Sequence, residues 1–189
     1  SKVCIAGLQW GDEGKGKFVD YFASSAKVVV RFQGGNNAGH TIVNKGVSYK
    51  LSLLPSGILH EGKISFIGSG VVVDLESLKS EIERNQRSGV KITTENLKVA
   101  ENITVVLPLY KQLDLLLETL KGDKKIGTTG RGISFAYQDI AGRRGIRICD
   151  LYEEEIFKER LNQIFEFYSP LISKYDSNFN IEASKKENL

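Results

Sequence analysis

The sequence predicts an α/β fold with a largely parallel central sheet that helices flank. Short apolar runs typical of buried strands alternate along the chain with segments of helical periodicity. The first two apolar runs each lead into a glycine-rich loop, and a turn signal predicts one β-hairpin near residues 41–53. Together these observations predict a P-loop-like phosphate loop directly after the first strand.

The first elements are a strand, a loop, a helix and a second strand. Val3–Leu8 has the apolar composition of a buried strand, and a helix is expected from about Lys15 to Ala26. Lys27–Phe32 predicts the second strand. The hairpin is expected to pair Thr41–Val43 with Val47–Leu51, and residues 64–67 and 71–73 supply further strands.

Three longer helices are predicted. Asp74 is expected to cap a helix that ends near residues 88–89, and we prefer this role to that of a magnesium carboxylate at a strand end. Pro108 opens a helix through Leu120. The last helix, from Glu153 to about Lys174, should pack on the sheet. Its expected apolar face comprises Ile156, Leu161, Ile164, Phe165, Tyr168 and Leu171.

Composition favours one ordinary globular domain over residues 1–189. The chain is 41% hydrophobic and 26% charged, and its net charge of +3 is spread along the whole length. No basic arm or stripe predicts a nucleic-acid partner. No apolar segment approaches the roughly 20 residues that cross a bilayer, so we expect a cytoplasmic protein without a membrane partner.

The loop Gly11 to Lys17 has the spacing G-x-x-x-x-G-K of a phosphate-cradling loop between a strand and a helix. Phe18 stands where the usual Ser or Thr would bind Mg²⁺, which weakens the assignment to ordinary P-loop nucleotide hydrolases. Asp12 lies within this loop, where a carboxylate would repel phosphate. The repulsion is avoided if a cation lies between the carboxylate and the phosphate, or if the carboxylate accepts a proton. Asp12 is therefore a candidate Mg²⁺ ligand and base.

Three other segments are weaker candidates. The second loop, residues 33–41, is rich in glycine and hydrogen-bonding side chains, and its His40 could donate to a transferred phosphoryl group or remain solvated. Residues 127–132 suit a phosphate monoester or a flexible loop. The pair Arg143 and Arg144 could clamp a phosphate or bind surface carboxylates. His60 has no evident partner and is expected to be solvated.

Four motifs occur in order: Gln9-Trp10-Gly11-Asp12-Glu13-Gly14-Lys15-Gly16-Lys17, Gly34-Gly35-Asn36-Asn37-Ala38-Gly39-His40-Thr41, Leu54-Pro55-Ser56-Gly57 and Gly127-Thr128-Thr129-Gly130-Arg131-Gly132. Together they resemble the adenylosuccinate synthetases. The resemblance runs from about Val3 to the region of Tyr152. It implies a homodimeric ligase of purine biosynthesis that joins IMP and L-aspartate, uses GTP as co-substrate and requires one Mg²⁺ ion.

The resemblance also implies a role for each matching residue. Asp12 would remove the N1 proton of IMP, His40 would stabilise the transferring phosphate, and Asp12 with the carbonyl of Gly39 would hold Mg²⁺. Arg143 would reach the IMP of the neighbouring subunit. GTP is expected to bind Gly11, Asp12, Glu13, Gly14, Lys15, Gly16, Lys17, Gly39, His40 and Thr41. IMP is expected to bind Asp12, Glu13, Gly14, Lys15, Asn37, Ala38, Gly39, His40, Thr129 and Arg143.

Two departures from the family accompany this resemblance. Residues 133–137 read Ile-Ser-Phe-Ala-Tyr where the family usually has Ile-Gly-Pro-Ala-Tyr. Family members are more than twice as long, so the chain is expected to be the N-terminal part of a synthetase domain, without the aspartate-binding and guanine-reading residues. The alternatives are a generic P-loop phosphotransferase or nucleotide switch, and a nucleotide-binding fragment without catalytic activity.

Overall fold

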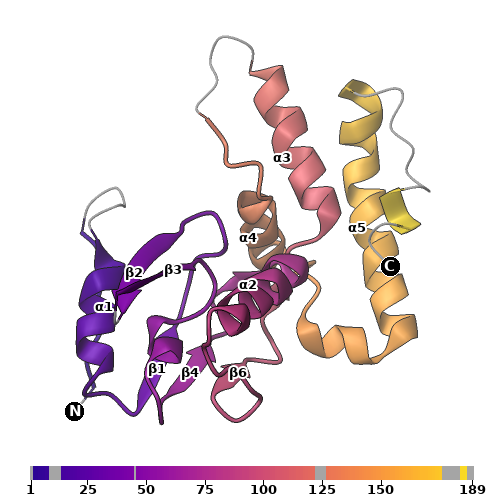
Figure 1. Ribbon diagram of the computed structural model, residues 1–189. Coiled ribbons are helices and arrows are strands. Elements are labelled where there is room, and N and C mark those ends of the chain that lie inside the picture. Colours follow the sequence, from indigo (N-terminus) through magenta and orange to yellow (C-terminus); the bar gives the residue numbers. More distant parts are fainter. Residues whose placement is uncertain (1, 9–13, 45, 122–126, 176–183, 187–189) are drawn as a thin grey trace. The chain divides into compact units, whose positions relative to one another are not determined.

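The computed structural model describes residues 2–8, 14–44, 46–121, 127–175 and 184–186, and Figure 1 labels its helices α1 to α5 and most of its strands. By its internal contacts the chain forms two compact units, Ser1–Val71 with Glu76–Ala100 and Val72–Leu75 with Glu101–Leu189. The prediction of one domain stays a prediction. The elements are α1 (Lys15–Ala23), β1 (Val28–Arg31), β2 (His40–Asn44), β3 (Val47–Leu51), η1 (Ser56–Leu59), β4 (Ile64–Ile67), β5 (Val72–Val73), α2 (Leu75–Arg87), β6 (Leu97–Val99), β7 (Thr104–Val105), α3 (Pro108–Leu120), α4 (Ile133–Ala141), η3 (Ile148–Tyr152) and α5 (Glu154–Tyr175).

The first unit is built on a parallel sheet of strand order β1-β4-β6. Val28 pairs with Ile64, and Ser65 pairs with Leu97, so the strands run side by side in one direction. Helix α1 contacts η1 and β2 within this unit. The predicted α/β class with a parallel sheet is confirmed.

The predicted hairpin is also confirmed. Strands β2 and β3 pair antiparallel, from His40 opposite Leu51 to Asn44 opposite Val47. Gly46 has a φ of 79°, a left-handed conformation that glycine adopts without steric cost and that tight hairpin turns require.

The first predicted strand is not formed. Residues 2–8 have no regular secondary structure, and the side chains of Val3 and Leu8 are 67% and 97% exposed. A strand exists only where a neighbouring strand accepts and donates its backbone hydrogen bonds. Among the described residues, β4 pairs with β1 on one side and with β6 on the other, and no strand pairs with residues 2–8. An apolar run alone therefore did not suffice.

The second unit combines a short parallel pair, β5 with β7, with three helices. Pro108 occupies the first turn of α3 as predicted. Asp74 directly precedes α2 and its Oδ2 lies 2.6 Å from Lys111 Nζ. The predicted face of α5 is partly wrong, because Ile156 is 44% exposed and Ile172 is buried in place of Leu171.

The aromatic contacts of α5 go to two helices rather than to a sheet. The ring of Tyr168 packs edge-on against Tyr110 of α3 and Phe135 of α4, with centroid separations of 6.3 and 5.7 Å. The core of this unit is therefore a junction of helices, which the periodicity of α5 alone could not specify.

Candidate functional site

The phosphate-loop motif is described from Gly14 onward, whereas Gly11, Asp12 and Glu13 lie outside the described residues. Gly14 has a φ of 79° and stands immediately before α1, whose first residues are Lys15, Gly16 and Lys17. The amide groups of a helix's first turn have no partners within the helix and attract anions. The motif therefore places two lysines at a helix N-terminus, as the spacing predicted.

The second loop has a buried half and an exposed half. Gly35 and Asn36 are buried, and the carbonyl of Gly35 accepts a 2.8 Å hydrogen bond from Nη2 of Arg31. Asn37 and Ala38, two of the predicted IMP contacts, are exposed. The loop thus has an anchored base and an accessible outer segment, the arrangement that a binding loop needs.

His40 brings the two loops together. A Cβ atom placed on Gly16 would lie 2.4 Å from Cδ2 and 2.7 Å from Cγ of His40, so the imidazole ring rests on the first turn of α1. Burial lowers the pKa of His40, and the charge of Arg31 lowers it further, while Glu81 and Asp20 oppose the shift. A ring held neutral in this position acts as a hydrogen-bond donor or acceptor beside an anion.

The third loop, residues 127–132, is held at both ends by helix α3. Glu118 Oε1 accepts a 2.7 Å hydrogen bond from the amide of Gly127, and Asp114 Oδ2 accepts one of 3.1 Å from the amide of Gly132. These two acids are four residues apart and therefore lie on one face of the helix. The exposed Thr129, a predicted IMP contact, lies between the two anchors.

The two arginines of the 142–145 turn have different environments. Arg144 donates from Nε to Oδ1 of the fully buried Asp139 at 3.0 Å, and its guanidinium lies 3.8 Å from the centre of the Phe167 ring. Arg143 is exposed and has a φ of 58°, which is rare for a residue with a side chain. Arg143 is thus the more accessible arginine of the pair, whereas Asp139 and Phe167 engage the guanidinium of Arg144.

Asp139 is the centre of a buried hydrogen-bond network that the sequence did not reveal. It accepts hydrogen bonds from the hydroxyl groups of Tyr110, at 2.7 Å, and Tyr168, at 2.9 Å. Burial and the carboxylate raise the pKa of both tyrosines above their ordinary value, so both remain protonated donors. The network joins α3, α4 and α5 directly beneath the arginine turn.

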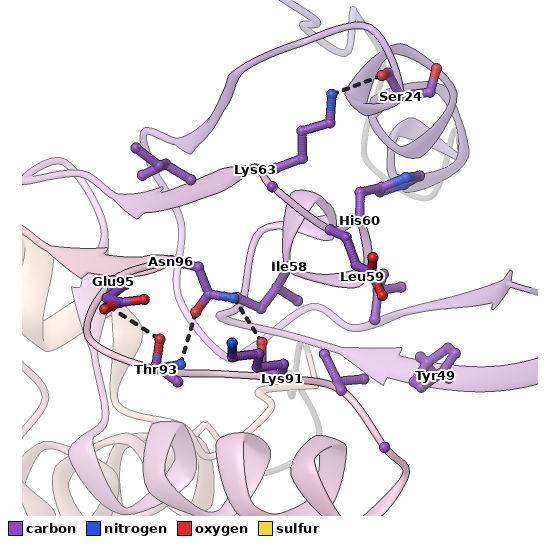
Figure 2. Close-up of a pocket in the computed structure, with 15 residues that line it drawn as sticks. Ser24, Tyr49, Ile58, Leu59, His60, Lys63, Lys91, Thr93, Glu95 and Asn96 are labelled. Atoms are coloured by element: carbon purple, nitrogen blue, oxygen red, sulfur yellow. Dashed lines mark hydrogen bonds between the residues drawn. The ribbon is translucent and has the colours of Figure 1, made fainter.

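One cavity of the first unit, of about 1020 Å³, is lined by η1 and by the segment 89–96, as Figure 2 shows. None of the candidate residues described above lines it. The side chain of Asn96 in its wall already has partners within the protein. Its Oδ1 accepts a hydrogen bond from the amide of Thr93, and its Nδ2 donates one to the carbonyl of Lys91. Here the expectation for His60 is wrong, because its Nε2 lies 2.8 Å from Oδ1 of Asp20.

Sequence reasoning missed three buried or half-buried charged residues that support the candidate loops. Arg31, Glu81 and Asp139 stand at positions where local patterns predict only a strand end or a helix. Their partners are far away in sequence, so no short motif could identify them. One local pattern could have indicated Glu81, because this acid lies between the apolar residues Leu78 and Ile82 of α2.

The chain is thus an α/β protein in which a glycine-rich loop packs on a helix N-terminus through a histidine, an arrangement typical of proteins that bind phosphate groups. The adenylosuccinate synthetase family model matches residues 4–189. The adenylosuccinate synthetase of Clostridium novyi (strain NT) is 51% identical over 175 residues, which are 93% of this chain and 41% of that protein. The chain belongs to the adenylosuccinate synthetase family.

Solved structures agree with this assignment. The fully ligated adenylosuccinate synthetase of Plasmodium falciparum matches with a TM-score of 0.78 and 36% identity, over 95% of this chain and 42% of that one. The cyanophage S-2L succinoaminodeoxyadenylate synthetase, bound to dGMP and dATP as an energy donor, matches with a TM-score of 0.53 and 26% identity, over 71% of this chain and 36% of that one. The chain thus spans about two fifths of the length of these relatives.

No three His, Cys, Asp or Glu side chains among the described residues gather in a way that could hold a metal ion. No helix within the described ranges is long and apolar enough to span a membrane.

Proposed function

We propose that the chain is the N-terminal part of an enzyme that ligates IMP and L-aspartate to adenylosuccinate, with GTP converted to GDP and phosphate. The observation that carries the proposal is the packing of His40 on Gly16, because it unites two motifs separated in sequence at one helix N-terminus. Family membership supports the choice of substrates. The cytoplasmic location inferred from the sequence stays a prediction.

The proposed reaction has two steps, phosphorylation of IMP and displacement of that phosphate by aspartate. Asp12 takes the N1 proton of IMP, O6 attacks the γ-phosphorus of GTP, and GDP leaves, which forms 6-phosphoryl-IMP. The amine of aspartate then attacks C6 and expels phosphate. His40 donates a hydrogen bond to the transferring phosphoryl group, while the α1 N-terminus with Lys15 and Lys17 attracts the phosphates of GTP.

The donor set of the two loops fits Mg²⁺. Asp12 would provide a carboxylate oxygen and Gly39 a carbonyl oxygen, both hard ligands of the kind that this ion prefers. Gly39 directly precedes β2, and a Cβ atom there would be 3.2 Å from Oγ of Ser52, so its backbone lies close to the end of the hairpin. When bound, the ion would neutralise charge on the phosphate groups.

The IMP phosphate and the second subunit belong to the same proposal. Thr129 lies in the loop that α3 holds at both ends, and the exposed Arg143 would reach the IMP site of a neighbouring subunit. A guanidinium suits a phosphate monoester because it donates two parallel hydrogen bonds. The functional enzyme would therefore be a homodimer.

The test is a synthetase assay on the longest form of the protein, with IMP, GTP, Mg²⁺ and aspartate, that follows the absorbance of adenylosuccinate. Asp12→Asn removes the base without changing its size, and we expect the rate to fall by about 100-fold or more. Glu61→Gln is the control, because it also converts a carboxylate to an amide but at an exposed position of the same unit. Equal rates for wild type and Asp12→Asn would refute the mechanism.

A further inference from the structure

Helix α2 presents a row of polar side chains to the second loop and the hairpin. Ser77, Glu81 and Arg84 follow one another at spacings of four and three residues, so they lie on one helix face. Oγ of Ser77 accepts a 2.8 Å hydrogen bond from Nδ2 of Asn36, and Nη2 of Arg84 donates one of 2.8 Å to the carbonyl of Lys50. This polar face contacts both segments.

Glu81 makes the most extensive of these contacts. Its side chain is buried, and its carboxylate accepts the amide hydrogens of Ser52, Leu53 and Leu54 at 2.7, 2.9 and 3.2 Å. A buried carboxylate is costly unless hydrogen bonds compensate it, and three amides provide that compensation. An apolar residue at this position would leave the three amides without their acceptor. The carboxylate therefore fixes the backbone just beyond β3.

The segment that Glu81 fixes supports the second loop. The carbonyl of Ser52 accepts a hydrogen bond from Nη1 of Arg31, and Nη2 of the same guanidinium donates to the carbonyl of Gly35. On its other side Ser52 lies close to Gly39, where a Cβ atom would be 3.2 Å from Oγ of Ser52. Ser52 thus lies beside Gly39, and Leu51 directly before it pairs with His40 in the hairpin.

We propose that Glu81 is a positioning residue of the candidate site. By holding Ser52–Leu54 it keeps Gly39 in place and the ring of His40 against Gly16, which is the contact that assembles the two loops. The link to catalysis rests on the proposed function, whereas the positioning itself can be measured without it.

The test compares Glu81→Gln with Glu83→Gln. Glutamine keeps the size of Glu81 but offers one acceptor oxygen in place of two, and its NH₂ group faces amide donors. Glu83 is exposed on the same helix, so its variant makes the same change of charge away from the contact. We expect hydrogen exchange to quicken by about 10-fold or more in Glu81→Gln only, at whichever of the three amides faces the NH₂ group. The nuclear Overhauser effect between His40 and Gly16 should weaken in parallel.

A second variant covers the case in which Glu81→Gln does not fold. Glu81→Asp keeps the charge and both acceptor oxygens but is one methylene shorter, so it weakens the hydrogen bonds to Ser52, Leu53 and Leu54 without removing the acceptor. It should weaken the same Overhauser effect to a smaller degree. An unchanged Overhauser effect and unchanged exchange in the folded variant would overturn the inference.

Kinetics separate this inference from the proposed function. In the form that carries synthetase activity, displacing His40 should lower kcat by about 10-fold or more, because the contact with the transferring phosphoryl group acts in the transition state. A weakened Overhauser effect with unchanged kcat would leave the positioning role of Glu81 intact and refute the role of His40.

Discussion

Gly132 should be the glycine of the third loop that tolerates substitution least. It has a φ of 69°, and a Cβ atom there would lie 2.7 Å from both C and Cβ of Tyr110 and 2.8 Å from the amide nitrogen of Lys111. The backbone of α3 cannot move aside cheaply, so overpacking adds about 1–3 kcal/mol to the roughly 1–2 kcal/mol of the left-handed conformation. Alanine also makes the unfolded chain less flexible than glycine does, and this offsets about 0.5–1 kcal/mol of the loss in the free energy of unfolding. Gly132→Ala should therefore cost about 1–4 kcal/mol.

Gly127 provides the matched control within the same loop and the same unit. Its φ is 84°, but nothing lies within 4 Å of an added Cβ atom, so only the backbone cost applies. Gly127→Ala should cost about 1 kcal/mol. Equilibrium urea unfolding followed by circular dichroism measures both, provided the m-value is unchanged. Equal losses for the two variants would refute the steric argument.

Three further predictions concern the second unit. Arg143→Gly should be about 1 kcal/mol more stable than Arg143→Ala in urea, because glycine relieves the left-handed backbone, yet both should raise the KM for IMP. Tyr168→Phe should lower the free energy of unfolding by about 1–3 kcal/mol, because Asp139 loses a buried donor; unchanged unfolding would contradict this. The hydrogen bond from the amide of Gly127 lowers the pKa of Glu118. The bond is therefore present above that pKa and is lost as the pH falls through it. The NMR chemical shift of the Gly127 amide should change with pH below 4.5.

Elements with strong local signals could be predicted from the sequence, and elements that depend on distant partners could not. The Asn-Lys-Gly turn specified the hairpin, and Pro108 fixed the start of α3. Residues 2–8 were misjudged because an apolar run becomes a strand only beside another strand. The face of α5 shifted to Ile172 because its neighbours are helices rather than a sheet.

The candidate site divides in the same way. Glycine spacing identified the loops, since a loop that approaches a phosphate group needs small residues close together in sequence. It could not identify the side chains that hold these loops. Glu81 bonds to amides 27 to 29 positions away, and Tyr110 and Tyr168 each lie 29 positions from Asp139. Such contacts exist only after the chain has folded.

Two acids of α3, Asp114 and Glu118, hold the two ends of the loop 127–132. The sequence of the loop alone does not specify these contacts. A protein engineer who transplanted residues 127–132 into another α/β scaffold would transfer a flexible peptide rather than a binding surface. The smallest transferable unit is the loop together with its supporting helix. In a natural lineage, the same coupling should make the two acids and the two terminal glycines change together or not at all.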